Sequence, residues 1–474
     1  MTRLRTSAII LISLFAVLIL AGIVADRLGA SAQATATLML FLALLSLVAT
    51  ALLASAMRGS VFQVAAETGA PIIILALAGV GVGLALLPGR GSAGLDSAVV
   101  LCMAAAFLTH GLLVPVDVTD LPDQSLGDAL FRRFQSRLVA VLAAICGLGL
   151  MLALAATLGQ RAVDILTRVA DVSPAGARGI VVLVTLLIIL PGGARSIVAA
   201  SAVAIAIGVV GWVAPVAAGA VRQGALSFDG FMGVLDGYFG DARFDDTSLG
   251  WLLAALGLTA VLHLPVSSRN AGVNRHGYAL ASLGLVAASG LAALAARFLT
   301  GLDGVSPVVL SVHRTIPVLF LLTSFALVVH GLARTLVRDI LYRLRRHSGT
   351  ASGRLALQRL VALVLVPVTT LGLLPPLALS DPLARALLLL GAAVPWPLLL
   401  LSRWRRVDWR AAACGIASAL LAALGVAAGI VPSGPGFAAA GLSCLVAGAL
   451  AAMVFRPRES SPSPASAAPA DVAP

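Results

Sequence analysis

The stretch VLFLLTSFALVVHGLARTLVRDILY, from Val318 to Tyr342, is a long apolar run that carries two adjacent hydroxyls, Thr323 and Ser324, and a histidine, His330. A run of this length crosses a bilayer as an α-helix. Polar side chains in hydrocarbon need partners, so we expect these three to face the protein interior or a wet cavity. Adjacent hydroxyls at mid-membrane are candidate ligands of a cation, because hard cations take oxygen ligands. The structural alternative is that the hydroxyls bond back to the preceding turn and that His330 bonds a neighbouring helix.

The composition of the whole chain is that of a membrane protein. Of its 474 residues, 60% are hydrophobic and 11% charged, and the mean hydropathy is +1.06. No water-soluble fold buries so much apolar surface, so we predict an all-α polytopic membrane protein with about 13–14 transmembrane helices. The apolar runs lie at residues 8–25, 36–56, 62–87, 97–114, 137–158, 177–192, 197–221, 249–264, 277–297, 316–340, 356–375, 383–402, 411–430 and 437–455. The first run is either a retained helix or a cleaved signal peptide.

Arginine placement predicts the orientation. All 32 basic residues are arginine, and the loops on one side of the predicted membrane carry 22 of them against 10 on the other. The richer side is therefore cytoplasmic, with the C-terminus inside, and the helix from Val318 to Tyr342 runs from outside to inside. Because aromatic residues are few and the charges lie between apolar runs, we attribute the net charge of +12 to topology and expect no nucleic-acid partner. We expect a bacterial-type inner membrane as the location.

Motifs of enzymes and of ATP-driven pumps are missing from the sequence. It has no HExxH, no nucleophile elbow and no Walker A motif. The four cysteines fall inside apolar runs without metal-ligand spacing, which favours a packing role. We therefore predict that the protein is not an enzyme and has no cofactor, with Na⁺ as a possible coupling ion.

Four short motifs occur in a fixed order along the chain. Each combines turn residues or hydroxyls with the start or end of a predicted span. They are carried by Asp128, Arg133, Phe134 and Ser136; by Gly192, Gly193, Arg195, Ile197, Pro215 and Val216; by Thr323 and Ser324 with Asp339, Ile340, Leu341 and Tyr342; and by Trp404, Arg405, Arg406 and Gly415. In this combination the chain resembles the sodium:solute symporter family, as a divergent member of its acetate/cation symporter-like branch.

The resemblance implies a LeuT-type fold, in which two inverted five-helix repeats enclose a site at mid-membrane. It divides the chain into N-terminal flanking helices (1–60), a ten-helix transporter core (61–403), two C-terminal flanking helices (404–456) and a disordered tail (457–474). The span at 62–87 becomes the first core helix, and the span at 316–340 becomes the eighth.

The resemblance also implies a sodium site between these two core helices. Carbonyls of a broken first helix, at Ala70 and Ile73, and the hydroxyls of Thr323 and Ser324 are its implied ligands. The sequence offers the required break, since Gly69, Pro71 and Gly79 interrupt the first core span and a proline removes one backbone N–H. The alternative is a proline kink filled by the side chain of a neighbouring helix.

The expected substrate site departs from the family pattern. Gln63 is retained, but the polar positions that follow have become Pro71 and isoleucines 72–74, and Ser201 and Ala204 replace the usual pair after the Gly-Gly turn. His263 opens a segment that only partly matches its counterpart in the family.

Three ionisable residues are candidates for substrate binding or coupling, together with Gln63. For Glu67, one interpretation is a proton acceptor, and the alternative is a carboxylate that is paired with Arg58 or hydrated by water at the membrane interface. His330, and more weakly His263, couples proton movement or makes a structural hydrogen bond.

We therefore expect a secondary active transporter that couples Na⁺ or H⁺ to symport of a small organic solute such as a short monocarboxylate. Its partners are that solute, a monovalent cation and the lipid bilayer. The alternative is a transport-inactive symporter-derived protein that acts as a ligand sensor or scaffold.

Overall fold

The computed structural model describes residues 20–21, 24, 27, 31–56, 69–87, 95–113, 125–223, 228–242, 246–262, 271–301, 306–345, 351–372, 389–391, 393–430 and 433–455. Every regular element among these residues is helical. The helices are α2 (Ala32–Ala56), α4 (Ala70–Ile74), η1 (Leu75–Val82), α5 (Gly83–Ala85), α6 (Ser97–Leu113), α8 (Leu126–Phe134), α9 (Arg137–Ala170), α10 (Pro174–Gly192), α11 (Ala194–Gln223), α12 (Phe228–Gly240), α13 (Asp246–Leu262), α14 (Ala271–Gly301), α15 (Pro307–Arg334), η2 (Thr335–Leu341), α16 (Tyr342–Arg345), α17 (Ala351–Thr370), α19 (Pro395–Leu401), α20 (Trp409–Ala427) and α21 (Ser433–Val454), of which η1 and η2 are π-helices.

The prediction of an all-α polytopic membrane protein is confirmed. Among the described residues, eight helices are long and apolar enough to cross a membrane, and five shorter apolar helices accompany them. Each predicted span from 36–56 to 437–455 corresponds to one of these helical segments. Most of the first predicted span, 8–25, and the predicted tail, 457–474, lie outside the described residues.

Helix α15 and its continuation through η2 and α16 form the centre of the molecule. Its most apolar window is 89% buried inside the protein, more than that of any other candidate span in the described chain. The helix begins at Pro307, earlier than the predicted start at Val318, because the Ser306 hydroxyl accepts from the Val308 N–H and proline suits the first turn. A helix buried on all sides is a scaffold against which other helices pack.

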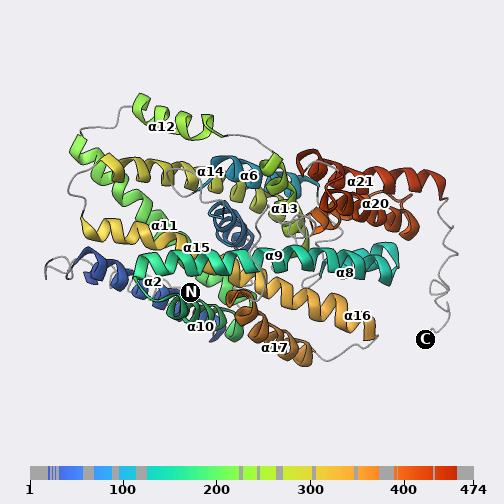
Figure 1. The fold of residues 1–474 in the computed structure, drawn as a ribbon, viewed down its shortest axis with the longest axis horizontal. Helices are drawn as coiled ribbons and strands as arrows, with labels where there is room; N and C mark the ends of the chain where they lie inside the picture. Colours follow the sequence, from blue (N-terminus) through green and yellow to red (C-terminus); the bar gives the residue numbers. More distant parts are fainter. Residues whose placement is uncertain are drawn as a thin grey trace, which may run out of the picture.

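The helices around α15 form two groups. In the first, α6 packs against α13 and α14, and α14 also packs against α4. In the second, α9, α10 and α17 pack against α15 and against one another, with α2 beside α10 and α15. Figure 1 shows α6, α13 and α14 along one edge of the molecule, α2, α10 and α17 along the other, and α9 and α15 between them.

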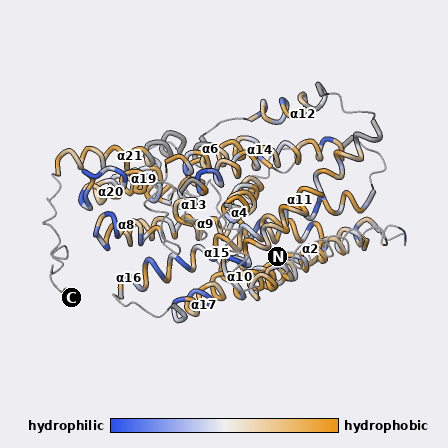
Figure 2. The backbone as a smooth tube through the Cα atoms, turned by 180° about the vertical axis from the view of Figure 1, so that it is seen from behind, coloured by the Kyte–Doolittle hydropathy of each residue, from blue (hydrophilic) through white to orange (hydrophobic). Residues whose placement is uncertain are grey.

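Hydrophilic segments gather at one end of the bundle. Figure 2 shows them in α8, α16, α17 and α20, towards the end where the C-terminus lies, whereas the long helices are hydrophobic. On the flanks, large apolar side chains such as Leu283 and Leu421 are exposed, which is expected of lipid-facing positions. The end rich in hydrophilic residues is the end to which arginine placement assigned the cytoplasm.

Two predicted loops contain short helices. Helix α8 begins with a capping box, in which the Ser125 hydroxyl accepts from the Asp128 N–H and the Asp128 carboxylate accepts from the Ser125 N–H. It ends at Gln135, whose φ of 51° breaks the helix, and Ser136 caps the start of α9. Helix α12 packs against α14, and its Tyr238 hydroxyl donates to the Leu95 carbonyl at 3.2 Å.

Candidate functional site

The first core span is irregular in two places. Gly69 has a left-handed backbone, with φ of 72°, and Pro71 lies in the first turn of α4. From Leu75 to Val82 the backbone is π-helical, and α5 then completes the span. Pro71 thus opens the described helix, and the irregularity at mid-span is the π-helical segment around Gly79. A π-helical segment shifts carbonyls out of the ordinary ladder and is frequent at functional sites.

The hydroxyls of α15 make different contacts. The Ser324 hydroxyl lies 2.8 Å from the Phe320 carbonyl of its own helix and 3.1 Å from the Ala78 carbonyl of η1, and its single proton is shared between them. The Thr323 hydroxyl bonds back to the Leu319 and Phe320 carbonyls at 3.1 and 3.0 Å. Both side chains are fully buried. Ser324 therefore links the two core spans, and Thr323 makes the back-bond that we considered as the structural alternative.

Glycines allow this close approach of the two helices. A Cβ added at Gly83 would overlap the Ser324 hydroxyl and would lie 2.5 Å from the Ser324 Cβ. A Cβ at Gly79 would lie 2.5 Å from the Leu327 side chain, one turn further along α15. A larger residue at Gly83 pushes the helices apart because it meets the Ser324 Cβ, whereas at Gly79 the end of the Leu327 side chain has to move. The contact between Ser324 and Ala78 therefore depends on the glycine at position 83.

The implied carbonyl ligands lie earlier in the same span, before the segment that contacts Ser324. Ala70 and Ile73 are in α4, which packs against α14 and α11, whereas η1 and α5 carry contacts with α15. The carbonyl beside Ser324 is that of Ala78, two turns beyond Ala70. The roles assigned to Ala70 and Ile73 remain predictions. Gln63, Glu67 and His263 lie outside the described residues.

His330 lies beside the Gly-Gly turn between α10 and α11. Gly193 has φ of 56° and ψ of −127°, a backbone suited to glycine, and a Cβ added there would lie 3.2 Å from the His330 ring. The turn belongs to one of the four sequence motifs, and the structure places it against the histidine of the central helix. After this turn, Ser201 is buried, and its hydroxyl has no hydrogen-bond partner in the described part of the chain.

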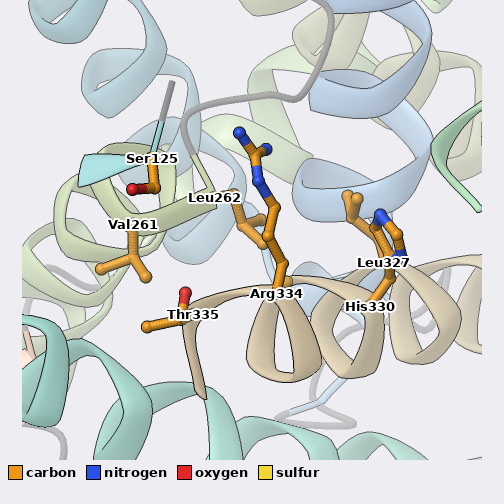
Figure 3. A pocket seen from close by; sticks show the side chains of 8 residues that line it. Ser125, Val261, Leu262, Leu327, His330, Arg334 and Thr335 are labelled. Atoms are coloured by element: carbon orange, nitrogen blue, oxygen red, sulfur yellow. The ribbon is translucent and has the colours of Figure 1, made fainter. Parts of the chain in front are cut away.

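A small recess lies beside His330, which is one of its lining residues. Its walls come from α15 and η2, from Ser125 at the start of α8, and from Val261 and Leu262 at the end of α13. Figure 3 shows His330 and Arg334 rising from the same side of α15, with Ser125 and Thr335 at the other end of the recess. The recess therefore lies where the two helix groups meet.

An ionic cluster joins α8 to the end of the central helix. Asp128 forms ion pairs with Arg338 at 2.8 Å and with Arg343 at 2.7 Å. Burial raises the pKa of Asp128, but both arginines and the hydrogen bonds from Ser125 outweigh it, so the pKa lies below its ordinary value. Beside them, the Ser125 hydroxyl donates to the buried Asp339 carboxylate.

Helix α8 is also tied to the end of α19. The Arg133 guanidinium donates to the Ser402 and Trp404 carbonyls at 2.7 and 2.6 Å. These contacts hold α8 against the end of α19 and the turn that follows it. The motif that begins near Trp404 thus meets the motif that contains Arg133, although each was identified from a separate part of the sequence.

Sequence reasoning missed several of these partners. Ala78 carries no side-chain signal, since its contribution is a backbone carbonyl. The pairing of Asp128 with Arg338 and Arg343 was detectable only as opposite charges on predicted cytoplasmic segments. Ser125 was detectable as a helix cap from its spacing to Asp128, but its donation to Asp339 depends on the packing of two distant segments.

The comparisons with known proteins concern the fold. A Na⁺-coupled sialic acid symporter, solved in a substrate-bound outward-open state, is similar to this chain with a TM-score of 0.70 and 13% identity, covering 90% of this chain and 98% of the symporter. A manganese transporter from Eremococcus coleocola gives a TM-score of 0.40 and 13% identity, covering 82% of this chain and 86% of the transporter, and carries no argument. No protein-family model and no curated protein matches the chain.

The fold class follows from the first of these likenesses. The protein is a multi-pass helical membrane protein with a LeuT-type fold, in which two inverted five-helix repeats are accompanied by flanking helices. At 13% identity the likeness extends to the fold alone, so substrate and coupling ion are matters of proposal.

Proposed function

We propose that the protein is a secondary active transporter that couples Na⁺ or H⁺ to symport of a small organic solute such as a short monocarboxylate. The fold supports transport, because LeuT-type folds place substrate and ion sites between their repeats. The motifs shared with the sodium:solute symporter family, and with its acetate/cation symporter-like branch, support the coupling ion and the class of solute.

The single observation that carries the proposal is the contact between Ser324 and Ala78. A buried hydroxyl and a carbonyl from a π-helical segment face each other across the two core helices that the proposed site requires. Oxygen atoms of this kind coordinate hard cations. A cation bound here would contact the Ser324 hydroxyl oxygen and the Ala78 carbonyl oxygen, and these contacts would replace the hydrogen bond between the two groups. To make room for the ion, α5 and α15 would separate slightly.

The energy available to such a transporter is sufficient. One cation crossing about 100 mV releases about 2.3 kcal/mol, and a tenfold concentration gradient adds about 1.4 kcal/mol. Their sum holds a neutral solute at roughly 500-fold accumulation, whereas a monocarboxylate anion moved one-to-one with one cation carries no net charge and is held at about tenfold by the concentration gradient alone.

Uptake into proteoliposomes tests the proposal. The purified protein is reconstituted, and radiolabelled acetate uptake is measured under an inward Na⁺ gradient, an inward H⁺ gradient, or neither. We expect uptake with one gradient only. Ser324→Ala is expected to raise the half-saturating cation concentration by roughly tenfold or more, the effect of removing one ligand of a charged group.

A matched control is available in the same helix. The Ser311 hydroxyl is buried and donates to the Pro307 carbonyl one turn earlier, so Ser311→Ala removes a hydroxyl from α15 away from η1. This variant should transport like the wild type. Equal effects of Ser311→Ala and Ser324→Ala on the cation requirement would contradict the proposed site.

A second candidate is a transport-inactive protein that senses a ligand or scaffolds a partner. The observation in its favour is the tight contact at Gly83, together with the back-bond of Thr323, because both hydroxyls are already hydrogen-bonded within the protein. Acetate and other short monocarboxylates that bind the protein without being transported under either gradient would favour this candidate.

A further inference from the structure

The segment that leads from α19 into α20 is rich in exposed arginine and tryptophan. It reads SRWRRVDWR over residues 402–410. Trp404 and Trp409 are 56% and 44% exposed. The arginines of this segment are exposed as well, and so are two arginines on the adjoining α8 and the start of α9; together they are Arg403, Arg405, Arg406, Arg410, Arg132 and Arg137. We call these eight side chains the arginine–tryptophan patch.

The patch lies at the boundary of the membrane helices. Helix α19 ends at Leu401, and α20, a candidate span, begins at Trp409, so the turn between them leaves the apolar region and enters it again. The apolar helix α6 ends beside this turn, because Arg403 donates to the Leu113 carbonyl at 3.2 Å. The span formed by α9 begins nearby at Arg137, directly after α8. Since several apolar helices end or begin here, the patch lies at the depth of lipid headgroups.

The backbone of the turn is held from two sides. From α8, the Arg133 guanidinium donates to the Ser402 and Trp404 carbonyls. On the other side, Arg403 contacts the end of α6. The turn is therefore a preformed surface between α6, which belongs to the first helix group, and α8, which leads into α9 of the second.

Little negative charge opposes the arginines within the described residues. Asp408 caps α20 by accepting from the Ala411 N–H at 2.9 Å, and Asp128 on α8 is held by the ion pairs described above. Arg405 and Arg406 make no hydrogen bond, ion pair or ring contact with the described part of the chain. Their guanidinium groups are therefore available to a ligand outside the protein.

A rival occupant of the patch is the segment between α6 and α8. Residues 114–124 lie outside the described residues, and the sequence gives them three aspartates, at 117, 120 and 123. Together with Asp408 they supply four carboxylates against the six arginines of the patch. Positive charge remains on the patch even when each carboxylate is paired, which favours an anionic partner from the surrounding membrane.

We propose that the arginine–tryptophan patch is a binding surface for the headgroups of anionic phospholipids. A lipid phosphate accepts paired hydrogen bonds from the planar guanidinium group, which a point charge does not offer. The indole rings of Trp404 and Trp409 have an apolar body and a polar N–H, which suits the boundary between acyl chains and headgroups. Clusters of basic residues directly beside membrane helices attract anionic lipids in the cytoplasmic leaflet, the side to which arginine placement assigns this end. The inference goes beyond the proposed transport function and does not depend on it.

Quenching of tryptophan fluorescence by brominated lipid tests the proposal. The full-length protein is reconstituted in phosphatidylcholine bilayers in which an equal fraction of the lipid is replaced by dibrominated phosphatidylglycerol or by dibrominated phosphatidylcholine. Bromine on the acyl chains quenches tryptophans that contact the brominated lipid. The difference between the wild type and the double variant Trp404→Phe with Trp409→Phe isolates the signal of the patch. We expect this signal to report about fivefold enrichment of phosphatidylglycerol, the scale of one arginine near an anionic lipid surface.

Two double variants identify the source of the enrichment. Arg405→Gln with Arg406→Gln should reduce it to less than about twofold. Arg354→Gln with Arg359→Gln removes the same charge from α17 and should keep it. Figures 1 and 2 both show α17 apart from α20, with α16 between them, so the second pair is a matched control. Size-exclusion chromatography checks that both variants remain folded.

Several outcomes overturn the proposal. These are equal quenching of the patch by the two brominated lipids, enrichment that survives the loss of Arg405 and Arg406, and an equal loss in the α17 control. Enrichment that appears only after the aspartates at 117, 120 and 123 are replaced by asparagine would show that the segment 114–124 occupies the patch, and this also overturns the proposal. Enrichment as expected in a protein that moves no acetate would support the lipid surface and count only against the proposed transport function.

Discussion

Replacing Gly83 with alanine is the sharpest test of the contact between the two core helices. An added Cβ would overlap the Ser324 hydroxyl, would lie 2.5 Å from the Ser324 Cβ, and would lie 3.3 Å from the Phe320 carbonyl. Ordinary contacts begin at 3.4 Å, so α5 and α15 must separate by roughly 1 Å at this point. That movement also breaks the hydrogen bond from Ser324 to Ala78.

The expected cost follows from these contacts. Overpacking a well-packed interior costs about 1–3 kcal/mol, and loss of one buried hydrogen bond adds about 1 kcal/mol. Alanine is a better helix former than glycine by about 1 kcal/mol, which offsets part of this. We expect Gly83→Ala to lower the free energy of unfolding by about 1–3 kcal/mol.

Three further variants separate the clash from a general effect of alanine. Gly179→Ala in α10 meets nothing within 4 Å, so it should be neutral or slightly stabilising. Ser324→Gly removes both atoms that the new Cβ would strike, so the double variant with Gly83→Ala should be more stable than the sum of the single effects by at least about 1 kcal/mol. Reversible SDS unfolding of the purified protein measures all four free energies. Additivity, or equal stability of Gly83→Ala and Gly179→Ala, would refute the packing deduced here.

The remaining predictions concern the ionic cluster that joins α8 to the end of the central helix. Ser125→Ala should destabilise by roughly 2–3 kcal/mol, because it removes a helix cap and the hydroxyl donor to buried Asp339, whereas Ser136→Ala removes only a cap and should cost about 1 kcal/mol in the same unfolding assay. Equal costs would show that the Asp339 contact contributes nothing. Asp128→Asn should destabilise by roughly 1–3 kcal/mol at pH 7. Because the pKa of Asp128 is lowered on folding, its ionic contribution is fully present above the ordinary value of 3.8 and is lost as the pH falls through the lowered pKa, so the difference from the wild type should vanish only in strong acid. A difference that disappears already near pH 6 would contradict this assignment.

The helices could be predicted from the sequence because their signal is local. A run of apolar residues long enough to span hydrocarbon forms a helix regardless of its neighbours, since every backbone group must be satisfied within the segment. The central helix followed this rule. The Gly-Gly turn was predictable for a different local reason, since the backbone of Gly193 favours glycine. Helix α8 lies in a segment that the span pattern left between two spans, although the spacing of Ser125 and Asp128 is that of a capping box.

The candidate site could be predicted only in part. The hydroxyl pair of α15 was evident because polar groups are rare in apolar runs, and of the two Ser324 rather than Thr323 reaches the neighbouring core helix. The opposing carbonyl was assigned to Ala70 and Ile73 by resemblance, whereas Ala78 lies beside the hydroxyl. Carbonyls are identical at every residue, so their exposure depends on helix geometry and not on residue type.

By itself, the sequence determined that this protein is a bundle of membrane helices, because hydropathy acts on each segment separately. Arginine placement predicts their orientation in the same segment-by-segment way. Only the tertiary structure decided which oxygen faces Ser324, which carboxylate holds the arginines at the end of the central helix, and where a recess remains. These features arise where segments far apart in the chain meet. Their positions depend on the rotation and depth of each helix, which are set by close packing at glycines such as Gly83 rather than by any local pattern.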